Sequence, residues 1–215
     1  MELWISNSVV AVVLLSFWIL ASSRLLSCLR AVAAQGAVLA VLPLLLVAAG
    51  HGEHLLRAVA LAGASLTLKA VLMPALLWRV IRLAEVRREV EPLVPFGPGL
   101  LLGAVLTGLS FAAAGRLPLE GGLRILLAGG LSVLLLGLLI LVGRTKAVTQ
   151  VVGYLMLENG VYLIGLLLHR QMPLLVEAGI LLDVFAGVFI MGIFAYRIQQ
   201  TFDHMDTHNL VSLKD

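Results

Sequence analysis

The stretch Gly153-Tyr-Leu-Met-Leu-Glu-Asn-Gly-Val-Tyr-Leu-Ile-Gly-Leu-Leu-Leu168 is a long apolar run with one acid, Glu158, near its centre. A short polar turn follows, and a second apolar run, Glu177 to Ile193, carries two more acids, Glu177 and Asp183. Runs of this length and character predict membrane-spanning helices. An ionised carboxylate in hydrocarbon is costly, so each acid is expected to face protein or water and to have a function.

Composition extends this interpretation to the whole chain. Of its 215 residues, 61% are hydrophobic and only 13% are charged, about half the charged fraction of a typical soluble domain. The apolar runs are continuous rather than alternating, which argues against a β-barrel. We predict an all-α fold, a polytopic bundle of about seven transmembrane helices. The expected segments are 4–21, 27–49, 54–81, 97–115, 122–143, 147–169 and 172–197.

The loops predict the topology and the domain organisation. Ten basic residues fall on one side of the segments and four on the other, so the positive-inside rule places the N-terminus outside and the C-terminus in the cytoplasm. The richer side holds Arg24, Arg30, Arg79, Arg82, Arg87, Arg88, Arg144, Lys146, Arg197 and Lys214, and the other Arg57, Arg116, Arg124 and Arg170. The polar interruption between Arg79 and Pro98 predicts a three-helix half (1–91), a four-helix half (92–200) and a cytoplasmic tail (201–215).

The three acids are predicted to form a proton path. Glu158 lies roughly 16 Å from the start of its helix, near the middle of the membrane, and Asp183 should reach a similar depth. Glu177 should lie roughly 9 Å nearer the outer face. Carboxylic acids suit such a path because, once desolvated, they load and release a proton near neutral pH. The alternative is that each acid only forms a hydrogen bond across a helix pair.

Lys69 is a fourth candidate, close to the middle of segment 54–81. A buried lysine either pairs with a carboxylate or gives up its proton. Two interpretations remain open, a charge-compensating partner in ion movement and a static salt bridge to an acid of a neighbouring chain. Pro74 lacks a backbone N–H, so we expect a bend that frees a carbonyl between Ser65 and Ala70.

The sequence lacks the motifs of covalent chemistry. It contains no phosphate-binding loop, no HExxH, no CxxC and no nucleophile elbow. His204 and His208 are four residues apart, but two histidines are too few ligands for a metal site. We therefore predict no catalytic residues, no metal and no cofactor in this chain. The arginines are confined to short loops, so membrane lipid rather than nucleic acid is the expected surroundings.

The chain resembles component E of hydrogenase-4 and of related formate hydrogenlyase complexes. The resemblance rests on the length, the seven segments, the run from Leu182-Asp183-Val to Met191-Gly192, and the Thr201-Phe-Asp203 tail. Residues 122–197 also resemble the K subunit of NADH-quinone oxidoreductase (Complex I). The K-type motif Glu-Ala-Ala-Ile-Gly-Leu matches Glu177-Ala-Gly-Ile-Leu181. The other K-type motif, Gly-Leu-Glu-x-Met-x-Asn, would place its glutamate at Leu155, one turn before Glu158.

These resemblances imply a non-catalytic subunit of an oxidoreductase-type complex in a bacterial or archaeal inner membrane. Such a subunit would bridge the redox module to antiporter-like subunits, and its acids would help to move protons or sodium ions. Metal clusters and quinone would belong to other chains. Two alternatives remain, a purely structural assembly subunit and a small autonomous transporter, although no broken helix pair or internal repeat of the transporter type is visible.

Overall fold

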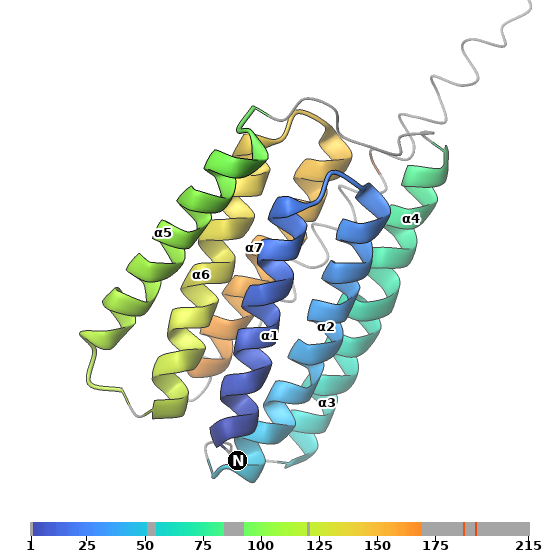
Figure 1. Ribbon diagram of the computed structural model, residues 1–215. Helices are drawn as coiled ribbons and strands as arrows, with labels where there is room; N and C mark the ends of the chain where they lie inside the picture. Colours follow the sequence, from blue (N-terminus) through green and yellow to red (C-terminus); the bar gives the residue numbers. More distant parts are fainter. Residues whose placement is uncertain are drawn as a thin grey trace, which may run out of the picture.

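The computed structural model describes residues 2–50, 55–83, 93–119 and 121–168, together with Gly187 and Gly192. All regular structure within these ranges is helical (Figure 1). The elements are α1 (Glu2–Ala21), α2 (Leu25–Ala48), α3 (Leu55–Ser65), the π-helical segment η1 (Leu66–Leu72), α4 (Met73–Leu83), α5 (Phe96–Gly115), α6 (Gly121–Gly143) and α7 (Ala147–Leu168). The α3, η1 and α4 segments follow one another without a break, and together they are called the third span below.

Six helices in the described ranges are long and apolar enough to cross a membrane. Each candidate span has 20 to 24 residues, which matches the roughly 20 residues that a bilayer requires. The prediction of an all-α transmembrane bundle is therefore confirmed, and six of the seven expected segments agree with helices of the structure to within a few residues. The seventh segment, 172–197, lies outside the described residues apart from two glycines.

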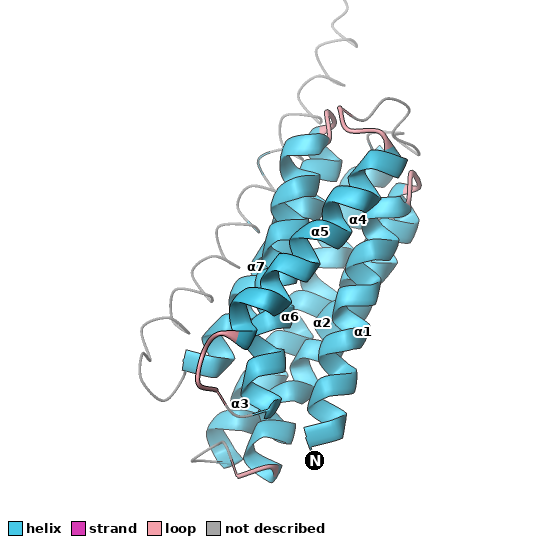
Figure 2. Cartoon of the chain, turned by 60° about the vertical axis from the view of Figure 1, so that its left-hand side comes forward, coloured by secondary structure: helices cyan, strands magenta, loops and turns pink. Residues whose placement is uncertain are grey.

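The spans pack side by side in one bundle (Figures 1 and 2). Helix α1 contacts α2, α5 and α6, while α2 contacts α1, the third span and α7. Helix α6 lies between α5 and α7 and contacts both. Helices from both predicted halves of the chain thus pack against each other, and the halves themselves stay a prediction.

Glycines set the close contact between α6 and α7. A Cβ atom at Gly137 would lie 2.4 Å from the backbone nitrogen of Leu157, and one at Gly160 would lie 2.4 Å from that of Leu134. These distances are too short for any side chain, so the two helices meet backbone to backbone. Such small-residue contacts drive helix association in membranes, where lipid is as apolar as leucine and supplies no hydrophobic force.

The outer faces of the bundle are apolar, as a membrane requires. Large side chains such as Leu101, Leu56 and Leu14 are 72%, 83% and 63% exposed. In the most apolar part of α5, only 17% of the residues are buried. Soluble proteins rarely expose so much contiguous apolar surface. In a bilayer the same residues face hydrocarbon, while polar side chains such as Gln35, Ser132 and Glu158 are buried inside the bundle.

Candidate functional site

The site begins with the π-helical segment η1, which carries Lys69 in the third span. A π-helix joins each N–H to the carbonyl five residues earlier, and Met73 N–H donates to the Leu68 carbonyl in this way. Pro74 follows directly and has no N–H to donate. The disturbance expected before Pro74 thus takes the form of a widened helical turn over Leu66–Leu72. Such turns are often found at functional sites.

Lys69 and Glu158 form an ion pair between the third span and α7, with Lys69 Nζ in contact with Glu158 Oε1. Both side chains are buried, 5% and 3% exposed. Each lies near the midpoint of its span, Ala58–Arg79 or Val148–Leu167. The lysine therefore pairs with an acid of its own chain. A buried charge of either sign is tolerated here because the opposite charge compensates it.

A second polar contact joins the same two helices one turn away. Ser65 Oγ donates a hydrogen bond to the Tyr162 hydroxyl oxygen at 2.9 Å. Ser65 precedes Lys69 by four residues and Tyr162 follows Glu158 by four, as expected for antiparallel helices in contact. The Lys69 Nζ also lies 5.3 Å from the centre of the Tyr162 ring, within the range of a cation–π interaction.

Two amide side chains extend this polar layer to α1 and α2. Asn159, next to Glu158, donates from Nδ2 to Gln35 Oε1 at 3.3 Å. Gln35 Nε2 in turn donates to the Val12 carbonyl at 3.0 Å and to Ser16 Oγ at 2.8 Å. Gln35, Ser16 and Asn159 are all buried. The amides thereby satisfy one another and fix α1, α2 and α7 at one level of the bundle.

Sequence reasoning missed Gln35 and Asn159. The cost of a polar group in hydrocarbon, which singled out the acids, applies to amides as well, with a smaller penalty. A glutamine near the middle of Leu25–Ala48 and an asparagine beside Glu158 were therefore detectable signals.

Gly36 lets α2 approach the lysine. A Cβ atom at this position would lie 2.7 Å from the carbonyl carbon of Lys69 and 2.9 Å from the backbone nitrogen of Ala70. Both atoms belong to the backbone of η1, so they cannot rotate away. The absence of a side chain at Gly36 thus fixes the distance between α2 and the segment that carries the ion pair.

Two predicted site residues, Glu177 and Asp183, lie outside the described residues. Gly187, four residues after Asp183, is described, and a Cβ there would lie 3.1 Å from the Met73 side chain. Met73 is itself four residues after Lys69. Within the described ranges, no group of three His, Cys, Asp or Glu side chains is arranged to hold a metal ion.

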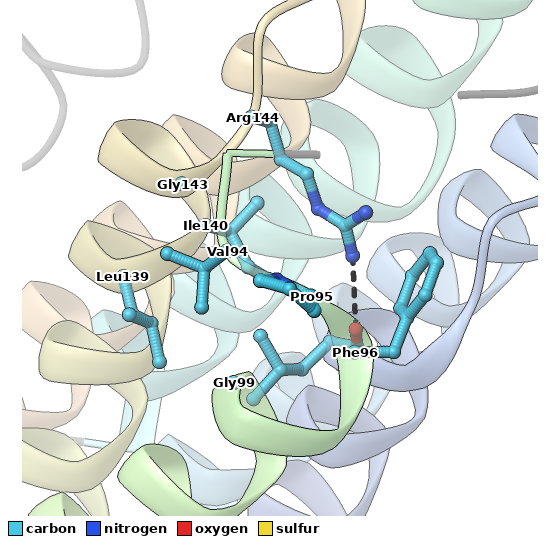
Figure 3. Close-up of a pocket in the computed structure, with 9 residues that line it drawn as sticks. Val94, Pro95, Phe96, Gly99, Leu139, Ile140, Gly143 and Arg144 are labelled. Carbon is cyan, nitrogen blue, oxygen red and sulfur yellow. Dashed lines mark hydrogen bonds between the residues drawn. The ribbon is translucent and has the colours of Figure 1, made fainter. Parts of the chain in front are cut away.

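A separate polar feature, centred on Arg144, lies at the end of the bundle where α6 stops (Figure 3). Its guanidinium is buried, donates to the Leu20 carbonyl at 2.9 Å and lies 4.6 Å from the centre of the Phe96 ring. Leu20 belongs to the last turn of α1, whose carbonyls have no partner within the helix. A cation also suits the negative end of a helix dipole. Arg144 therefore holds the ends of α1, α5 and α6 together.

The central arrangement is suited to proton movement. An ammonium and a carboxylate in contact can exchange one proton, which converts the charged pair into a neutral amine and a neutral acid. Both forms have no net charge, so the exchange changes the local field without leaving an uncompensated charge in the membrane interior. Strongly interacting sites of this kind titrate as a pair.

Fold and site together define the class, a multi-pass helical membrane protein with a buried ion pair at half its depth. The chain belongs to the hydrogenase-4 component E family. It is 33% identical to hydrogenase-4 component E of Escherichia coli K12 over 150 residues, which cover 68% of each chain. The same values hold for that component of Escherichia coli O157:H7 and of Shigella flexneri.

A further relative is an uncharacterized protein of Mycobacterium tuberculosis. It is 35% identical over 189 residues, which cover 86% of this chain and 84% of the relative. No protein-family model matches the chain, and no solved structure matches it.

Proposed function

We propose that the chain is a membrane subunit of a hydrogenase-type complex, and that its buried Lys69–Glu158 pair takes part in ion translocation. The family membership supports the first part, because three of the relatives are named as component E of hydrogenase-4. The second part rests on one observation, an ion pair with side chains only 5% and 3% exposed at the middle of the spans. Ionisable residues at this depth are rare and mark ion pathways or proton relays.

The ion moved by the pair is the proton. Glu158 accepts a proton when Lys69 releases one, and it passes the proton on when a change elsewhere in the complex restores the charge on Lys69. Glu177 and Asp183 are included as further acids of the path on the strength of the sequence alone. The partners are antiporter-like subunits and the subunits nearest the redox module. The K-type resemblance of 122–197 supports this position, with the C-terminus on the cytoplasmic side of a bacterial or archaeal inner membrane.

The test uses the assembled complex in inverted membrane vesicles. Proton uptake is measured by quenching of a pH-sensitive dye while the redox reaction of the complex runs, and assembly is measured on native gels. We expect Glu158→Gln to assemble and to keep redox turnover but to lose most of the uptake. The matched control is Ser132→Ala, a buried polar change in α6, because the Ser132 hydroxyl donates only to its own helix.

The same assay separates the alternatives. A purely structural subunit predicts that Glu158→Gln pumps normally once assembled, which would refute the relay. An autonomous transporter predicts ion flux by the purified chain alone in liposomes, and a subunit predicts none.

A further inference from the structure

Two antiparallel helices carry two polar contacts in register, the Lys69–Glu158 pair and the Ser65–Tyr162 hydroxyl pair. Four residues advance a helix by about 6 Å, so the hydroxyl pair lies one turn along the interface from the ion pair. It lies on the side of the ion pair that leads toward Leu168, the end of α7. In Figure 1 this end of the bundle is the one where the N-terminus lies.

The Ser65 hydroxyl differs from other hydroxyls of the spans. Ser16, Ser110 and Ser132 each donate to the carbonyl four residues earlier in their own helix, and Thr67 does the same. This is the usual way in which a helix satisfies such a group internally. Ser65 instead donates across the interface to Tyr162. The Ser65 hydroxyl therefore forms a specific hydrogen bond between two helices in place of the usual bond within its own helix.

Position and chemistry suit a proton relay. Ser65 is 5% exposed and Tyr162 is half-buried, so the hydrogen bond between them is partly buried. A hydroxyl both donates and accepts hydrogen bonds, and its rotation exchanges these roles. Once the two hydroxyls have rotated, the Tyr162 oxygen can take a proton from the side of the ion pair while the Tyr162 proton passes to Ser65 and the Ser65 proton passes on to a water molecule toward the end of the bundle that holds the N-terminus. Each hydroxyl oxygen gains one O–H bond and loses one, so both are neutral before and after the transfer.

We propose that Ser65 and Tyr162 form the next proton-carrying step after Glu158, toward the end of the bundle that holds the N-terminus. The inference rests on the proposed function, since it needs Glu158 to carry the proton first. The competing explanation is a simple cross-link, because hydrogen bonds between membrane helices also stabilise their packing. A cross-link affects assembly, whereas a relay affects proton uptake per assembled complex.

Two matched pairs of variants separate these explanations in the vesicle assay. Tyr162→Phe removes the hydroxyl and keeps the ring, and Tyr154→Phe makes the same change one turn on the other side of Glu158. Ser65→Thr and Ser65→Val are equal in shape, and only Thr retains the hydroxyl. Positioned proton-transfer groups typically contribute about 10²–10⁴-fold. We therefore expect uptake per assembled complex to fall at least about tenfold in Tyr162→Phe and Ser65→Val, but to persist in Tyr154→Phe and Ser65→Thr.

The outcomes distinguish the two proposals. If Tyr162→Phe and Ser65→Val pump as well as their controls while Glu158→Gln does not, the hydroxyl step is wrong and the proposed function stands. If Glu158→Gln also pumps normally, the proposed function itself fails. If Tyr162→Phe does not assemble, the two Ser65 variants decide, and equal uptake by Thr and Val overturns the relay.

Discussion

Replacing Gly36 by alanine tests the packing that fixes the lysine. The new Cβ would lie 2.7 Å from the Lys69 carbonyl carbon, whereas ordinary contacts begin at 3.4 Å. Helix α2 and the π-helical segment must therefore separate by about 0.7 Å, because neither backbone can rotate out of the way. Overpacking of this kind costs about 1–3 kcal/mol, which corresponds to a fall in melting temperature of about 2–12 °C for a chain of this size.

Gly63→Ala is the matched control. Gly63 lies in the same span as Lys69, and nothing lies within 4 Å of its missing Cβ. Alanine is about 1 kcal/mol better than glycine inside a helix, so this variant should be as stable as the parent or slightly more so. The measurement is the temperature at which the detergent-purified chain loses its monodisperse peak in size-exclusion chromatography.

Equal melting of Gly36→Ala and Gly63→Ala would refute the reasoning. It would mean that α2 and the third span are not in backbone contact at this level. A lower melting temperature for Gly36→Ala alone supports the contact, and the variant then provides a way to loosen the ion pair without altering either charge.

Three further predictions use the same melting assay. Lys69→Met leaves a buried acid without its partner and should lower the free energy of unfolding by up to about 3–5 kcal/mol. Combining it with Glu158→Gln should recover most of this loss. Equal melting of the single and double variants would count against the ion pair. Gly160→Ala should lower the melting temperature by several degrees because α6 backbone blocks its Cβ, while Gly108→Ala, with open space around it, should not. Gln35→Leu should cost about 1–3 kcal/mol through the amide and carbonyl left unpaired, and unchanged melting would argue against the network.

The helices could be predicted from the sequence because membrane-spanning length is a local property. Each apolar run could be assigned without reference to the others, and the six spans of the described residues agree with these assignments. The partner of Lys69 was different. In a membrane the helices are apolar on all sides, so the pattern of hydrophobic residues does not indicate which faces meet. Only the packing of the third span on α7 brings Glu158 to the lysine.

Polar residues indicate which faces of the helices contact each other. Gln35 and Asn159 meet because neither finds a partner in lipid, and the same holds for Ser65 and Tyr162. The widened turn at η1 was partly foreseeable from Pro74, although its extent over seven residues was not. Mid-membrane polar side chains of every kind, rather than acids alone, were the better guide to the site.

The glycine contacts between α6 and α7 have a mechanical consequence. Gly130 and Gly137 on one helix, and Gly153 and Gly160 on the other, recur every seven residues and receive the opposite backbone. Two helices whose backbones contact each other at several glycines resist sliding, so we expect α6 and α7 to move as one rigid unit. Glu158 belongs to that unit. Movements that open or close the ion pair are therefore expected in the third span, where Lys69 lies in the π-helical segment η1.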